Sequence, residues 1–118
     1  MNIGDLVREA TRLSQKIDAG VQALNAAAAR AAHAEHDYRL HKAKAWMTCR
    51  DGTVPERQAQ VDGECADLRL ARDLAEGERV AALEALRSRR AQLSAVQSIA
   101  AAYRAEAEHG RYGTQETP

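Results

Sequence analysis

Three histidines and two carboxylates lie in one short stretch of this sequence, and imidazole and carboxylate groups are common ligands of divalent metal ions. The stretch contains His33, Glu35, His36, Asp37 and His41. Helical bundles hold metal ions with Glu-x-x-His motifs on several helices, whose carboxylates face the interior. This motif is absent from the stretch, and it is not repeated along the chain. We therefore interpret the stretch as a solvated polar face and expect neither a metal ion nor another cofactor.

Other groups that could carry chemistry also lack the partners that they need. The RSRR run from Arg87 to Arg90 points three charges toward different helix faces, which favours a solvated surface over a phosphate site. No histidine lies near Cys49 or Cys65 in the sequence to activate a thiol. A Gly-rich phosphate loop, a paired-carboxylate motif and a nucleophile elbow are all missing from the sequence. These observations predict a protein that is not an enzyme.

The composition favours long helices over a thick globular core. Seventeen Lys and Arg balance seventeen Asp and Glu, so net charge does not draw the chain toward nucleic acid or an anionic membrane. Hydrophobic residues make up 45% of the chain, but much of this is alanine, and phenylalanine is absent. No apolar run approaches the ~20 residues of a membrane span, and the first residues lack the apolar centre of a signal peptide. We expect a cytoplasmic protein without a membrane partner.

An apolar stripe with alternating steps of three and four residues predicts a helix from residue 3 to residue 50. Asn2 and Asp5 supply the polar groups that favour a helix start. The members of the stripe are apolar except for one glycine and one histidine. They are Leu6, Ala10, Leu13, Ile17, Gly20, Leu24, Ala27, Ala31, Ala34, Tyr38, His41 and Ala45.

The sequence DGTVPER predicts a tight turn over residues 51–53. Gly52 can take the left-handed conformation that ends a helix. Thr53 and Glu56 form the T-x-x-E pattern of a capping box. Pro55 lies in the first helical turn, where its missing N–H costs no hydrogen bond. Because the connection is so short, the two helices that flank it should pack antiparallel.

A second helix is expected from residue 54 to about residue 108, with a disordered tail over residues 111–118. Arg72, Arg79 and Arg89 interrupt its apolar stripe, so the seam between the helices should shift or widen. The members of this stripe are Val61, Cys65, Leu68, Ala75, Ala82, Leu86, Leu93, Val96, Ala100 and Tyr103. Residues 1–110 are thus predicted to form one domain, an all-α, coiled-coil-like hairpin of two long antiparallel helices.

If the hairpin turns about Gly52, residue i of the first helix faces roughly residue 104 − i of the second. This register places Ala27 opposite Gly77, where the two backbones could approach closely. It also predicts two ion pairs between the helices, each contributing ~0.2–1 kcal/mol. The pairs are Lys42 with Asp62 and Arg39 with Glu64.

The same register separates the two cysteines. Cys49 and Cys65 lie ~15 Å apart along the helix axis, beyond the separation that a disulfide allows. We expect both to be small apolar fillers in a reducing compartment.

Two helices bury only one stripe each, which leaves Leu40, Leu70, Leu74 and Leu83 partly exposed. The stability of a helix comes mostly from tertiary packing. We therefore expect two hairpins to assemble as a four-helix bundle dimer.

The end of the hairpin near the turn is open to two interpretations. Trp46 can either cover the open end of the bundle or, together with Arg57, anchor a protein partner. Four basic side chains in the same region could instead contact the phosphates of a nucleic acid. They are Arg39, Lys42, Lys44 and Arg50.

Three segments resemble a group of small helical proteins encoded in bacteriophage genomes, often near replication and recombination genes. The segments, DYRLHKAKAW, DGTVPERQAQVD and LRLARDLAEGERVAALEALRSRRAQLSAVQS, lie between Asp37 and Ser98. The resemblance implies an accessory protein in the cytoplasm of a bacterial host, and implies no specific activity. The chain also resembles secreted helical hairpins with a W-x-G turn and a Y-x-x-x-[DE] tail. Tyr112 and Glu116 fit that tail, but Met47 and Thr48 follow Trp46, so the W-x-G motif itself is missing.

The expected function is that of a non-enzymatic adaptor, a self-associating hairpin that binds a protein partner. A nucleic-acid-binding factor of phage replication or recombination is the first alternative, and a W-x-G-like secreted hairpin is the second.

Overall fold

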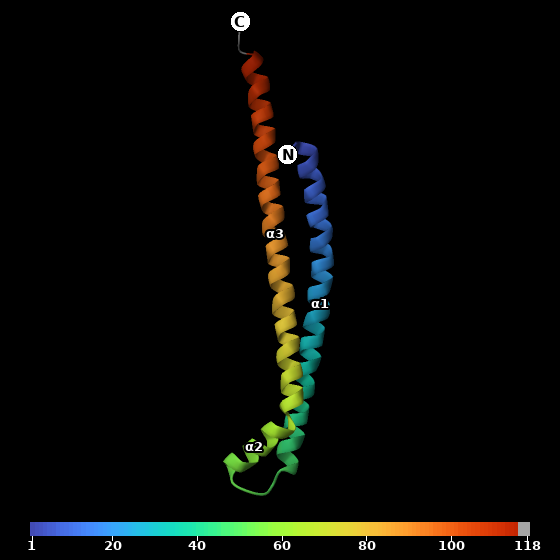
Figure 1. Ribbon diagram of the computed structural model, residues 1–118, viewed down its shortest axis with the longest axis vertical. Coiled ribbons are helices and arrows are strands. Elements are labelled where there is room, and N and C mark those ends of the chain that lie inside the picture. The colour runs from blue at the N-terminus through green and yellow to red at the C-terminus, as the bar shows by residue number, and fades with distance from the viewer. Residues whose placement is uncertain (116–118) are drawn as a thin grey trace. The chain divides into compact units, whose positions relative to one another are not determined.

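The computed structural model describes the backbone of residues 1–115 and the side chains of residues 1–111. Within these residues the chain forms three helices and no strand (Figure 1). Helix α1 spans Ile3–Thr48, α2 spans Val54–Glu64, and α3 spans Ala66–Gln115. The predicted all-α helical hairpin is confirmed.

The hairpin consists of two compact units. Unit 1 combines Met1–Val21 with the chain from Glu84 onward, and unit 2 is Gln22–Leu83. In unit 1 the Tyr103 hydroxyl donates to the Met1 carbonyl oxygen at 3.0 Å, while Gly20 lies against Leu86. Residue numbers therefore rise along α1 as those of the contacting residues on α3 fall, so the two helices pack antiparallel in this unit.

Unit 2 has the same antiparallel arrangement. Arg30 pairs with Glu78 at 3.6 Å, and Arg72 pairs with Glu35 at the same distance. The residue number on α1 therefore rises as the number on its partner falls. After α1 ends, the chain turns into α2 and bends again before α3 begins (Figure 1).

The apolar stripe predicted for the first helix is the side of α1 that is buried. Leu6, Leu13, Ala27, Tyr38 and Ala45 are all buried, and most other members of the stripe are half-buried. His41 is the exception: its side chain is exposed rather than near the seam.

Side chains cap the starts of α1 and α2. The Asn2 side-chain oxygen accepts from the Asp5 backbone N–H at 2.9 Å. At the turn, Gly52 has a φ of 100°, a conformation that costs glycine little. The Thr53 hydroxyl then accepts from the Glu56 backbone N–H at 3.3 Å, and Pro55 lies in the first turn of α2. The turn therefore ends one helix and begins the next with its own side chains.

The structure differs from the predicted single helix over 54–108 in two places. The helix breaks at Cys65, between α2 and α3. At its other end α3 continues to Gln115, so the predicted disordered tail over 111–118 is wrong as far as residue 115; residues 116–118 lie outside the described part. A glycine weakens a helix by only ~1 kcal/mol, so Gly110 and Gly113 do not end α3.

The break at Cys65 allows α2 to cover the end of α1. Val61 and Cys65 join Tyr38, Ala45 and Cys49 in one apolar cluster. Both cysteines are free and buried, and the Cys49 Sγ atom donates to the Gln60 Oε1 atom at 3.3 Å. Their predicted wide separation assumed a straight second helix. The bend instead places both in the same cluster.

The predicted register is correct at Met1 and Tyr103 but differs by about one helical turn in unit 2. Arg30 lies beside Glu78 there, whereas the prediction placed residue 74 beside it. Arg39 accordingly pairs with Glu35 on its own helix instead of Glu64. The bend at Cys65 takes residues of α2 out of the straight pairing, which accounts for this shift.

The close approach predicted at Gly77 is also wrong. A Cβ atom at Gly77 would meet nothing within 4 Å. The glycine that does approach a neighbour is Gly20, where a Cβ atom would lie 3.3 Å from the Leu86 Cδ1 atom. Small size is therefore required at Gly20 and not at Gly77.

Replacing Thr53 with Ala should lower the free energy of unfolding by ~0.5–2 kcal/mol, because the Glu56 N–H loses its capping acceptor. The matched control is Thr48→Ala, since the Thr48 hydroxyl bonds only to carbonyl oxygens of its own helix. Urea titrations followed by circular dichroism measure both. Equal losses in the two variants would contradict the capping role.

Replacing Gly77 with Ala should raise the free energy of unfolding by about 0.5–1 kcal/mol, because alanine favours a helix and the site has open space. Gly20→Ala should give less stabilisation or a net loss, because the Leu86 side chain must move. Thermal melts of the two variants beside the parent chain test this difference. An equal rise in both would show that Gly20 is not a packing constraint.

Candidate functional site

Trp46 and Arg57, the two candidate partner-binding residues, lie against each other at the turn. The guanidinium carbon of Arg57 is 5.3 Å from the centre of the Trp46 ring. The Arg57 Nε atom donates to the Cys49 carbonyl oxygen at 2.7 Å. Trp46 itself is half-buried and packs against the apolar cluster. Both side chains thus tie the beginning of α2 to the end of α1.

The four basic candidates for nucleic-acid contact are not gathered into one site. Arg39 donates from Nε to Glu35 at 2.6 Å, and Lys42 lies 5.7 Å from the centre of the Tyr38 ring. Arg50 donates from Nε to the Met47 carbonyl oxygen at 3.3 Å. Lys44 is exposed. Three of the four cations are therefore already engaged by groups of the hairpin.

Arg72 has a role that its position in the sequence does not indicate. Its guanidinium carbon lies 4.4 Å from the centre of the Tyr38 ring, and it pairs with both Glu35 and Asp73. The hydrogen bond to Asp73 is the main cause that raises the pKa of Arg72, against an opposing effect of burial. An apparent interruption of the stripe is in fact a cation that packs on the seam.

The histidine-rich stretch is a solvated face of α1. The side chains of His33, His36 and His41 are exposed, and Glu35 is held by Arg39 and Arg72. In the described part of the chain, no three His, Cys, Asp or Glu side chains come together as metal ligands would.

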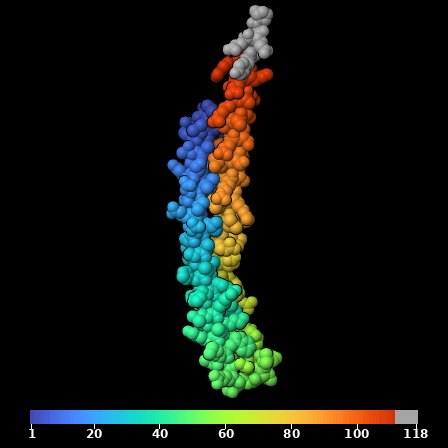
Figure 2. Space-filling view, turned by 180° about the vertical axis from the view of Figure 1, so that it is seen from behind, coloured from blue at the N-terminus to red at the C-terminus, as the bar shows by residue number. Residues whose placement is uncertain are grey.

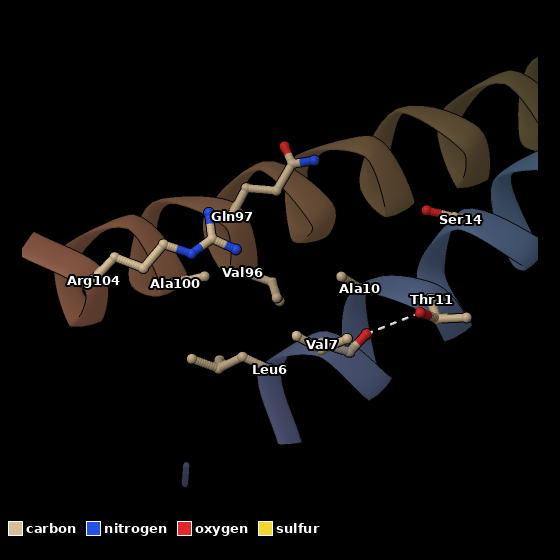
Figure 3. Close-up of a pocket in the computed structure, with 9 residues that line it drawn as sticks. All are labelled: Leu6, Val7, Ala10, Thr11, Ser14, Val96, Gln97, Ala100 and Arg104. Carbon is tan, nitrogen blue, oxygen red and sulfur yellow. Dashed lines mark hydrogen bonds between the residues drawn. The ribbon is translucent and has the colours of Figure 1, made fainter. Parts of the chain in front are cut away.

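Unit 1 has an open groove on each side of the seam between α1 and α3. The first, the Val7 groove, has a volume of about 450 Å³. Apolar side chains form its floor, and Arg104 reaches back along α3 toward Gln97 at its edge (Figure 3). The Thr11 hydroxyl in its wall donates to the Val7 carbonyl oxygen at 3.0 Å. The lining residues are Leu6, Val7, Ala10, Thr11, Ser14, Val96, Gln97, Ala100 and Arg104.

The second, the Ile99 groove, has a volume of about 410 Å³ and is mostly apolar. It is lined by Met1, Leu6, Glu9, Arg12, Leu13, Gln92, Ala95, Val96 and Ile99. A further hollow of about 390 Å³ shares Arg12 and Gln92 with it. This basic hollow is lined by Arg12, Lys16, Ala85, Ser88, Arg89 and Gln92. One side of unit 1 thus presents an apolar groove that leads into a positively charged hollow.

Electrostatics within the Ile99 groove are dominated by Glu9 and Arg12, which form an ion pair. The hydrogen bond from Arg12 lowers the pKa of Glu9, burial opposes this effect, and the charges of Arg12 and Lys16 add to it. The same hydrogen bond raises the pKa of Arg12. Glu9 therefore stays ionised and neutralises Arg12, which leaves Lys16 and Arg89 as the positive charges of the hollow.

These grooves were missed by sequence reasoning, which considered one apolar stripe per helix. A signal was present in α3, where small and apolar residues also recur at steps of three and four on a second face. That stripe is Ala85, Ser88, Gln92, Ala95, Ile99 and Ala102.

Arg57→Ala should lower the free energy of unfolding by roughly 1.5–3 kcal/mol, because a charged hydrogen bond to the Cys49 carbonyl is lost. Arg50→Ala is the control, since Arg50 is exposed and bonds only within its own turn of chain. Chemical denaturation of both variants measures the difference. Unchanged stability in Arg57→Ala would show that this side chain does not hold the turn.

Comparison of the chain with family models, with curated proteins and with solved structures found no match. Among residues 1–115, none of the helices combines the length and the apolar character that crossing a membrane requires.

Proposed function

We propose that this protein is a non-enzymatic interaction protein, a helical hairpin that associates with a second copy and binds a protein partner. The observation that carries this proposal is the incomplete burial of the seam in unit 1. Leu93, Val96 and Ala100 belong to the stripe that packs on α1, yet all three are only half-buried. Buried apolar area is the main source of stability in helix packing, so a further helix pair that covers this seam would stabilise the fold.

Exposed leucines in unit 2 supply the surface for a partner. Leu70 and Leu74 are one helical turn apart on α3 and are 58% and 60% exposed. On α1, Leu40 is 46% exposed. Large apolar side chains that cluster on a surface mark interaction sites. A partner with an amphipathic helix fits such a ridge, since its own apolar residues recur at the same spacing.

The contacts at the turn favour protein interaction over nucleic-acid binding. Arg39 is neutralised by Glu35, and Lys42 and Arg50 are engaged within the hairpin. Phosphate binding gains affinity when Lys and Arg side chains displace the counterions condensed on the nucleic acid, so it needs cations that are free to contact phosphates. The segment from Asp37 to Ser98 resembles small helical proteins of bacteriophages. On this basis alone, the proposal also includes an accessory role in a bacteriophage and a location in the bacterial cytoplasm.

Sedimentation equilibrium between about 1 and 100 μM should show a dimer with twice the mass of one chain, because two half-open seams cover each other. Thermal stability should also rise with concentration over this range. A monomer at every concentration, with an unchanged melting temperature, would contradict self-association. Binding of DNA in gel shifts at low salt would favour the nucleic-acid alternative.

A further inference from the structure

We propose that the second copy binds in the Ile99 groove of unit 1, with the two α3 helices antiparallel and Arg89 of each copy beside Glu106 of the other. This inference rests on the proposed self-association and specifies its face and direction. Two observations carry it: the spacing of the groove residues and the distribution of charge along them.

The groove residues of α3 have the spacing of a helix-packing seam. Ala85, Ser88, Gln92, Ala95 and Ile99 line the groove and the basic hollow, and they are separated by alternating steps of three and four. This spacing keeps one face of a helix toward a partner helix over many turns. Small residues dominate the stripe, so two such helices can approach closely. Ile99, 47% exposed, is its one large apolar side chain.

Charge is distributed unequally along this stripe. Lys16 and Arg89 line the basic hollow at one end, and neither has an ion-pair partner in the described part of the chain. The same spacing continues past Ile99 through Ala102 to Glu106, which is exposed. An antiparallel pair brings the basic end of one copy to the acidic end of the other. A parallel pair would instead place Arg89 beside Arg89 and Glu106 beside Glu106, at an electrostatic cost.

Helix α3 extends beyond its contact with Met1 in unit 1. Tyr103 contacts Met1, and α3 then continues to Gln115 past the start of α1 (Figure 2). In the antiparallel pair, the residues around Glu106 lie beside Arg89 of the second copy.

The Val7 groove fits a second copy less well. Its walls carry Thr11, Ser14 and Gln97, and the cationic Arg104 lies at its edge (Figure 3). Two copies joined through this face would bring these polar walls together. We therefore assign the second copy to the Ile99 groove.

A charge reversal tests the pairing directly. Arg89 and Glu106 are separated by about 25 Å along one helix, so they cannot interact within a chain. Arg89→Glu and Glu106→Arg should each weaken dimerisation roughly tenfold, because two ion pairs become repulsive in the symmetric dimer. The double variant should recover the parent affinity to within about twofold. Arg90→Glu combined with Glu106→Arg is the matched control and should give no recovery, since Arg90 does not line the groove.

A second pair of variants tests the face. Ile99 and Val7 are similarly exposed, at 47% and 52%, on the two grooves. Sedimentation should show that Ile99→Asp weakens the dimer at least about a hundredfold, since a carboxylate would be buried, while Val7→Asp leaves it unchanged. Circular dichroism of each variant checks that the helices persist.

The possible results separate the two proposals. A parent chain that is monomeric at all concentrations overturns both. A dimer that is lost in Val7→Asp and kept in Ile99→Asp overturns the assigned face, while self-association stands. The third result is a dimer that Ile99→Asp weakens but whose affinity the double charge reversal does not recover. That result overturns the antiparallel pairing.

Discussion

A pair of packed helices can bury only one side of each helix, and most of this structure follows from that constraint. Alanine is common along the α1 seam, as at Ala27 and Ala31, which lets the helices approach but adds little apolar area per residue. The few larger side chains are therefore concentrated where they contribute most, at Leu6, Leu13 and Leu86 in unit 1 and at Tyr38 in unit 2. Some apolar area therefore stays exposed because the hairpin has only two helices to pack against each other.

The parts of the fold that could be predicted are those that depend on nearby residues. The seam of α1 follows from its spacing, and the turn follows from Gly52, Thr53 and Pro55, whose backbone preferences are local. The break at Cys65 could not be predicted in this way. Gly63 costs a helix only ~1 kcal/mol, so the bend depends on contacts that Val61 makes in the apolar cluster, which are visible only in three dimensions.

The candidate site shows the same limit. Trp46 and Arg57 could be selected from their residue types, but their contact with each other depends on where α2 begins. The Ile99 groove is formed by side chains of two helices together, so considering one apolar stripe per helix did not indicate it. Arg72 was also misread as an interruption of the seam. Arg72 packs its guanidinium on the Tyr38 ring while its charge is matched by Glu35 and Asp73, as long cationic side chains can do at the edge of an apolar surface.

The division of the hairpin into two units has a consequence for the order in which the chain folds. Contacts near the turn, such as Cys49 with Arg57, join residues that are close in sequence, so closing that loop costs little chain entropy. The contact of Tyr103 with Met1 joins residues near opposite ends of the described chain. Local contacts form early in folding and distant ones form late. We therefore expect unit 2 to form before unit 1.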